Sequence, residues 1–263
     1  MRAMKAVLAC GAMPLAMACA ARPAAPAAPA PTEREALPAP AFTYGDQAAW
    51  GGDCGVTTNP QSPIDVRTDD VQAAGAPLTF SYPATATIAG DVEDDTYTIQ
   101  ARYEDAVAPA ERPSFVGPAG QFVLQRVHVH FPSEHTVDGR AHAGEMHMVH
   151  KSADGHFAVV AYFIDAGPTA NPLFDRLLAA DPGTNLKAPA EVALPMAWVP
   201  AETTRYWTYT GSLTTPPCTT GITWIVMKDP VLASEAQLAT WTARFEGTNR
   251  HTMPVLAAVT APE

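Results

Sequence analysis

Two runs with the alternation of β-strands, separated by a turn-rich segment, constrain the fold of this chain more than any other feature. They lie within residues 124–151, a stretch that holds six of the eight histidines. His128 and His130 are two residues apart in the first run, so both imidazoles project from one face of a strand. Glu145 and His147 share a face in the second run for the same reason. If the two strands pair, three imidazoles meet on one face of a sheet.

Three neutral imidazoles with an open fourth position are the ligand set of a catalytic zinc ion (Zn2+) that activates water. A structural zinc site would need a fourth protein ligand, and no cysteine lies nearby. The alternative is that these are ordinary strand histidines, exposed or hydrogen-bonded in the core, because an H-x-H motif alone is weak evidence. The carboxylate of Glu145, two residues before His147, favours the metal site.

Further strands are predicted from alternation or from continuous apolar runs at residues 78–82, 96–103, 121–131, 157–164, 205–210 and 222–227. In the strand of His128 and His130, strict alternation places Phe122, Leu124 and Arg126 on the zinc face.

One of these strands, residues 96–103, is expected to hold Tyr97, Ile99 and Ala101 on one face.

Two short helices are predicted from their capping residues. Asn171 and Pro172 begin one, and Ser234 with Gln237 forms a capping box that begins the other. No internal repeat and no domain boundary follow residue 42. Many strands with few helices therefore predict a single, mainly β (α+β) domain with a mostly antiparallel sheet, over residues 42–260.

Residues 1–18 have the pattern of a bacterial export signal. A positively charged start precedes an apolar run that is too short to span a bilayer, and Ala16-Met17-Ala18 fits a small-x-small cleavage site. Cys19 follows directly, which leaves two outcomes open: a lipid anchor at Cys19, or a soluble periplasmic or secreted protein. Residues 19–41 are rich in Ala and Pro and predict an extended, semi-rigid tether.

The formal net charge of −11 argues against nucleic-acid binding. Cys10 would leave with the signal, so Cys54 and Cys218 are the cysteines of the folded domain. In an oxidising compartment they suggest a disulfide, with two free thiols as the alternative. Closing a loop of roughly 160 residues would stabilise the fold by about 4–5 kcal/mol in the chain-entropy model.

These motifs together resemble the alpha-class carbonic anhydrases. The resemblance is carried by VHVHFPSEHTVDG, AGEMHMVH, YWTYTGSLTTPPC, ITWIVMKDP and QSPID, and it covers roughly residues 42–256. It implies a large twisted, mostly antiparallel sheet of about ten strands, with zinc at the bottom of a conical cleft. It also implies reversible hydration of carbon dioxide to bicarbonate and a proton by zinc-bound hydroxide.

The resemblance further implies a role for individual residues. The zinc ligands would be His128, His130 and His147. Glu145 would orient the third ligand. Thr214 would accept a hydrogen bond from the zinc-bound hydroxide and donate one to Glu134, and Thr215 would line the cleft near bicarbonate. The apolar wall for carbon dioxide would be formed by Val149, Val159, Leu213, Ile222 and Trp224. The cysteine pair matches the disulfide of bacterial and secreted members.

One departure from the family concerns proton transfer. Tyr97 falls in the position of the histidine proton shuttle, and a phenol is poorly matched to moving protons at neutral pH. We therefore expect slower, buffer-dependent turnover. The sequence offers four histidines that could substitute but places none of them at the cleft rim: His142, His150, His156 and His251.

A second departure is Arg126, which stands where the family usually has a glutamine that accepts a hydrogen bond from the first ligand. Arginine has no acceptor. Either His128 finds another acceptor, or Arg126 lies in the cleft and adds positive charge. We expect altered anion affinity rather than loss of zinc.

Two rival functions remain at this point. A non-catalytic carbonic-anhydrase-like surface binding domain is one, although such domains typically lose zinc histidines and all three are present here. A zinc hydrolase of esters is the other. A homodimer is also left open.

Overall fold

The computed structural model describes residues 34–82, 87–104, 107–117, 119–193 and 204–262. The predicted export signal, Cys19 and most of the tether lie outside these residues. In the described ranges the strands are β1 (Glu35–Ala36), β2 (Asp65–Val66), β3 (Gln72–Ala73), β4 (Thr79–Ser81), β5 (Thr87–Asp94), β6 (Ile99–Arg102), β7 (Ser114–Gly117), β8 (Gly120–His130), β9 (Thr136–Val137), β10 (Arg140–Ala141), β11 (Gly144–Lys151), β12 (Phe157–Gly167), β13 (Leu186–Ala193), β14 (Tyr206–Ser212), β15 (Thr220–Ser234) and β16 (Thr260–Ala261), and the α-helices are α1 (Pro172–Ala180) and α2 (Glu235–Phe245).

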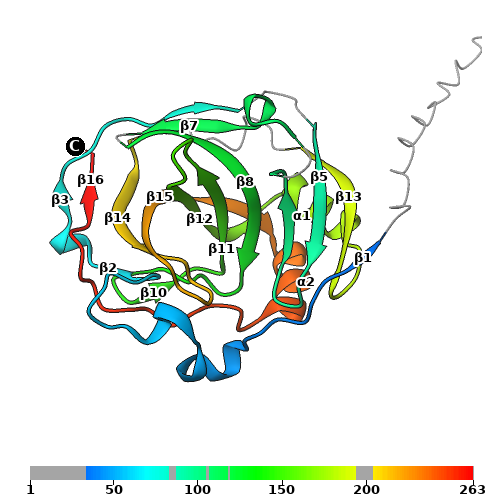
Figure 1. The fold of residues 1–263 in the computed structure, drawn as a ribbon, viewed down its shortest axis with the longest axis horizontal. Coiled ribbons are helices and arrows are strands. Elements are labelled where there is room, and N and C mark those ends of the chain that lie inside the picture. Colours follow the sequence, from blue (N-terminus) through cyan, green and yellow to red (C-terminus); the bar gives the residue numbers. More distant parts are fainter. Residues whose placement is uncertain (1–33, 83–86, 105–106, 118, 194–203, 263) are drawn as a thin grey trace, which may run out of the picture.

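Among the described residues, thirteen strands form one sheet, with the order β1-β13-β5-β6-β8-β11-β12-β15-β14-β16-β3 and with β7 and β4 attached beside β8 (Figure 1). Its pairs are antiparallel except β12 with β15 and β16 with β3. The large, mostly antiparallel sheet that the sequence predicts is therefore confirmed. The strand number exceeds about ten because β1, β3 and β16 are two-residue strands at or next to the sheet edges, too short to carry an alternating pattern.

The two faces of the sheet carry different side chains. On β11, Met146 and Met148 belong to a core that includes Phe174 of α1 and Trp241 of α2. Both helices begin where their caps predict: the Asn171 side chain accepts from the first turn of α1, and Ser234 with Gln237 forms the capping box of α2. The helices thus cover one face, and the site residues of β11 point to the other.

A β-bulge in β8 changes the predicted zinc face. The pairing of β8 with β11 shifts by one residue, which leaves Gln125 without a partner in the register. Phe122 and Leu124 are buried in the helix-covered core, whereas Arg126 and His128 line a cavity on the other face. The prediction that all these residues share one face is therefore wrong, because an extra residue inverts the alternation.

The segment before β6 also departs from strict alternation. Thr96 has a φ of 81°, and the Asp95 carboxylate accepts hydrogen bonds from the Tyr97 and Thr98 amides, so the chain turns here. Ile99, the first residue of β6, is in the helix-covered core, as is Ala101, but Tyr97 lines the cavity. The predicted common face is therefore wrong for Tyr97.

The described end of the tether lies along the sheet. Glu35 and Ala36 pair with β13, and the Lys187 ammonium lies 3.0 Å from the Glu35 carboxylate. The Leu37 amide then donates to the Asn185 carbonyl at 2.8 Å. Neither α1 nor α2, the helices of the described ranges, has the length and apolarity of a membrane span.

The helix-covered core contains a titratable group, His150. Its Nδ1 donates to the Met148 carbonyl at 2.7 Å, and its Nε2 accepts from the Tyr82 hydroxyl at 2.9 Å. Burial lowers the pKa of His150 to about 3. In the unfolded chain a histidine pKa is about 6.5, so the unfolded state takes up a proton first as the pH falls. The stability that this group contributes is present above pH 6.5 and is lost as the pH falls towards 3.

We therefore expect acid sensitivity to decrease in the variant His150→Gln. The free energy of unfolding of the wild type should fall by about 2 kcal/mol more between pH 7 and pH 5 than that of the variant. Urea unfolding of both proteins at the two pH values measures this difference. His156→Gln, in an exposed turn, is the control and should behave like the wild type. An equal fall in all three proteins would contradict the expectation.

Candidate metal centre

Pairing of β8 with β11 brings the three predicted ligands together. His128 lies opposite His147, and His130 lies opposite Glu145. The imidazole centroids are 5.0 Å apart for His128 and His130, 5.1 Å for His128 and His147, and 4.7 Å for His130 and His147. One ring nitrogen of each lies within 4.8 Å of the others. All three rings line a cavity of about 250 Å³.

Hydrogen bonds select the tautomer of two of these rings. The Nδ1 of His130 donates to the Thr248 carbonyl at 2.6 Å, which leaves Nε2 as a lone-pair donor. The Nε2 of His147 donates to Glu145 Oε1 at 2.7 Å, which leaves Nδ1 as the nitrogen with a free lone pair. His130 Nε2 is buried and has no hydrogen-bond partner, as expected of an atom that binds a metal. The residues fit zinc, because two of the imidazoles are fixed by an outer partner in the orientation that a ligand needs.

The electrostatics favour the neutral form of His128 and His147. Burial, followed by the closeness of the other two imidazoles, holds the pKa of His128 well below its usual value. Burial also lowers the pKa of His147, although the hydrogen bond to Glu145 opposes this. Neutral imidazole is the form that binds metal ions, so these two rings are in the form that a metal site needs.

Glu145 lies at the centre of a buried hydrogen-bond network. Its Oε1 also accepts from His135 Nδ1 at 2.7 Å, and its Oε2 accepts from the His135 amide at 2.7 Å. Burial alone would raise the pKa of this carboxyl, but the neighbouring His135 and His147 and their hydrogen bonds hold it well below its usual range. Glu145 is therefore ionised and accepts hydrogen bonds from both rings. His135 is in turn held by the Tyr209 hydroxyl, 2.7 Å from its Nε2.

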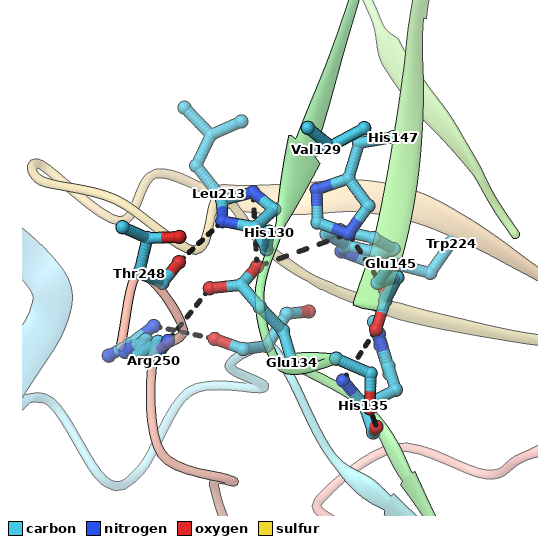
Figure 2. Close-up of polar contacts among 12 residues, drawn as sticks. Val129, His130, Glu134, His135, Glu145, His147, Leu213, Trp224, Thr248 and Arg250 are labelled. Atoms are coloured by element: carbon cyan, nitrogen blue, oxygen red, sulfur yellow. Dashed lines mark hydrogen bonds and ion pairs between the residues drawn. The ribbon is translucent and has the colours of Figure 1, made fainter. Parts of the chain in front are cut away.

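Glu134 lies between the imidazoles and the C-terminal segment (Figure 2). Its Oε1 accepts from the Arg250 amide at 2.8 Å. Its Oε2 is 3.7 Å from His130 Nε2 and 3.9 Å from His147 Nε2, and is buried without a hydrogen-bond partner. The hydrogen bond from Thr214 that the resemblance implies is therefore not formed to Oε2. Thr214 itself is buried and lines the same cavity as the three histidines.

The cavity brings together most of the remaining predicted site residues. Its lining includes Tyr97, Arg126, Val149, Val159, Leu213, Thr215 and Trp224. Ile222 is not in the lining; it is buried in the neighbouring apolar cluster with Val149 and Trp224. None of the four alternative shuttle histidines lines it either, and His150 is on the opposite face of the sheet.

The comparisons with known proteins agree with this geometry. A family model described as eukaryotic-type carbonic anhydrase matches residues 45–258. The chain belongs to the alpha-class carbonic anhydrases. The carbonic anhydrase of Klebsiella pneumoniae is 43% identical over 138 residues, 51% of this chain and 55% of that protein. The carbonic anhydrase of Nostoc sp. is 34% identical over 203 residues, 74% of this chain and 72% of that protein. The solved Photobacterium profundum alpha-carbonic anhydrase has a TM-score of 0.68 and 31% identity, and covers 79% of this chain and 91% of that one.

Family membership implies that this carbonic anhydrase acts on carbon dioxide and bicarbonate. The loop that holds Thr214 is fixed to another segment of the chain. The predicted disulfide between Cys54 and Cys218 is confirmed, and it ties this loop to the N-terminal segment. The Asp53 amide donates to the Pro217 carbonyl at 2.8 Å beside it.

Three residues of this carbonic anhydrase site have no predicted role in the sequence analysis: His135, Thr248 and Arg250. Thr248 acts through its main-chain carbonyl, which every residue has, so its identity carries no signal. Arg250 is buried, and its guanidinium bonds Gln61 Oε1 at 3.0 Å. His135 directly follows Glu134 in the SEHTVD motif, and this position was the one available signal.

Proposed function

We propose that this chain is a zinc enzyme that hydrates carbon dioxide reversibly, with His128, His130 and His147 holding the metal. The observation that carries the proposal is the meeting of three imidazoles at the cavity, two of them fixed by acceptors on their outer nitrogens. Zinc, when bound, supplies the Lewis acidity that lets water act as a nucleophile near neutral pH.

The remaining residues of the proposal position the reactants. Thr214 lines the same cavity as the three imidazoles, and the unpartnered Glu134 Oε2 would be the acceptor that orients its hydroxyl. Val149, Val159 and Trp224 form an apolar wall of the same cavity, and transfer of a small nonpolar molecule from water to such a wall is favourable.

Stopped-flow hydration of carbon dioxide, combined with the zinc content of the same sample, tests the proposal. We expect about one zinc per chain and hydration that disappears when zinc is removed and returns when it is restored. A protein that holds zinc and hydrates no carbon dioxide would instead be the non-catalytic binding domain.

Proton transfer to solvent is the step for which this cavity is least equipped. Tyr97 lines the cavity, but its hydroxyl donates to the Phe42 carbonyl at 2.8 Å, and its ring stacks on Phe42 with centroids 5.3 Å apart. An amide carbonyl is too weakly basic to take up that proton. The side chain is therefore held in place by contacts that do not lead protons outwards.

We expect turnover to depend on the buffer. At fixed pH, imidazole should raise the turnover number until it saturates, because the buffer carries the proton that Tyr97 does not. The variant Tyr97→His should raise turnover in dilute buffer by about tenfold or more and weaken the imidazole dependence. Tyr97→Phe, which keeps the ring, is the control and should match the wild type. A flat response of the wild type to imidazole would refute the expectation.

The disulfide suggests an extracellular or periplasmic location, because cytosolic thiols are kept reduced. We propose export through residues 1–18, followed either by release or by lipidation of Cys19. The mass of the mature N-terminus measures both outcomes: loss of the first 18 residues is expected, with added acyl mass if Cys19 is lipidated. A mature protein that keeps Met1 would overturn the proposal.

A further inference from the structure

The three imidazoles differ in what holds their outer nitrogens. Those of His130 and His147 donate to the Thr248 carbonyl and to Glu145, at 2.6 and 2.7 Å. The Nδ1 of His128 is buried and has no hydrogen-bond partner. Because Nδ1 is shielded by burial, Nε2 is the nitrogen left to bind a metal. The ring proton then lies on Nδ1, where it has no acceptor. A buried N–H in this state is less stable than one that donates to an acceptor.

The side chain next to His128 on the same face of β8 is Arg126, and both line the cavity. A guanidinium has five donors and no acceptor, so Arg126 cannot pair with the Nδ1–H of His128. Among the residues that the structure describes, Arg126 forms a single ion pair, 3.9 Å from Glu104 Oε1, and that carboxylate already binds Arg102 at 2.7 Å. Arg126 therefore directs a positive charge, and no lone pair, towards the site.

Two other polar side chains that line the cavity, Gln100 and Thr98, donate to groups other than His128. The Gln100 amide donates to Glu93 at 2.9 Å, and the Thr98 hydroxyl donates to the Val129 carbonyl at 2.8 Å. The bulge residue, Gln125, donates to the carbonyl of Val123. None of these groups accepts from His128, so the missing acceptor traces to the residue at position 126.

We propose that Arg126 is a positioning residue that lowers the zinc affinity of this site, because it leaves the first ligand, His128, without an outer hydrogen bond. The inference rests on the proposed function, since it takes His128 as a ligand. An outer partner fixes the ring orientation and raises the basicity of the ligating nitrogen, and its loss lowers metal affinity by about 10–100-fold. A site built in this way retains zinc when zinc is supplied and releases it faster than a site with three paired imidazoles.

Zinc release from the purified holoenzyme to a chromophoric chelator, with zinc affinity from chelator competition, tests the proposal. Arg126→Gln supplies an acceptor, and zinc release should slow by about tenfold or more. Arg126→Met removes the charge without supplying an acceptor, and its release rate should stay within about threefold of the wild type. Arg140→Gln makes the same substitution at an exposed arginine of β10 that does not line the cavity, and it should behave like the wild type.

Equal slowing in the Gln and Met variants would overturn the proposal, because charge removal alone would then explain the effect. So would a Gln variant that releases zinc as fast as the wild type. Arg126→Glu offers a different acceptor and should also slow release, which keeps the proposal testable if the Gln variant does not fold. A wild type that binds zinc without hydrating carbon dioxide would refute the proposed function and leave this inference standing.

Discussion

Replacing His147 by glutamine should remove nearly all carbon dioxide hydration. The side chain is buried and keeps roughly its size, but it offers an amide oxygen in place of an imidazole nitrogen. Losing only the outer partner of a zinc ligand lowers metal affinity by about 10–100-fold, so losing the ligand itself should cost more than about 100-fold. Hydration measured by stopped flow with limiting zinc should fall in the same proportion, together with the zinc content of the dialysed protein.

His142→Gln is the matched control for this experiment. His142 stacks on Phe163, hydrogen-bonds Asp165 at 2.8 Å and does not line the cavity. It should keep the activity and zinc content of the wild type. The role of His147 would be refuted if its variant, folded as judged by circular dichroism, still bound zinc stoichiometrically and kept its hydration rate.

The sequence predicts the meeting of the three imidazoles because one rule, applied to two paired strands, suffices for it. Residues two apart on a strand share a face, and Glu145 and His147 on β11 follow this rule without interruption. On β8 the rule fails for the residues before Arg126, because the bulge at Gln125 inverts the alternation. The sequence does not reveal this bulge, since it involves no glycine, proline or other residue that would indicate it. Phe122 and Leu124 therefore look like neighbours of the site in the sequence and lie on the opposite face in the structure.

The hydrogen-bond partners of the ligands divide in a similar way. Glu145 is visible in the sequence because a carboxylate near a histidine is a recognisable pair. The bond to the Thr248 carbonyl cannot be predicted from the sequence, since Thr248 lies 118 residues from His130 and any residue could supply a carbonyl. The absence of a partner for His128 is a property of the folded environment, and the sequence could only pose it as a question about Arg126.

Replacing Cys54 and Cys218 together by serine should lower the free energy of unfolding by about 4–5 kcal/mol. The disulfide joins residues 164 apart in the sequence, and its main effect in the chain-entropy model is to restrict the unfolded chain.

In the folded protein, two hydrogen bonds near the disulfide should keep the Thr214 loop close to its position when the disulfide is absent. The Asp53 amide bonds the Pro217 carbonyl, and the Arg250 guanidinium bonds the Cys54 carbonyl, both at 2.8 Å. The double variant should therefore unfold at a much lower urea concentration, yet hydrate carbon dioxide within a few-fold of the wild type when folded. Fully reduced wild type is the control and should match the variant in stability, while the variant itself should not respond to reductant.

If removal of the disulfide changed the unfolding free energy by less than about 1 kcal/mol, restriction of the unfolded chain would not be its role. Loss of activity at unchanged stability would instead assign the disulfide to holding Thr214 in the cavity.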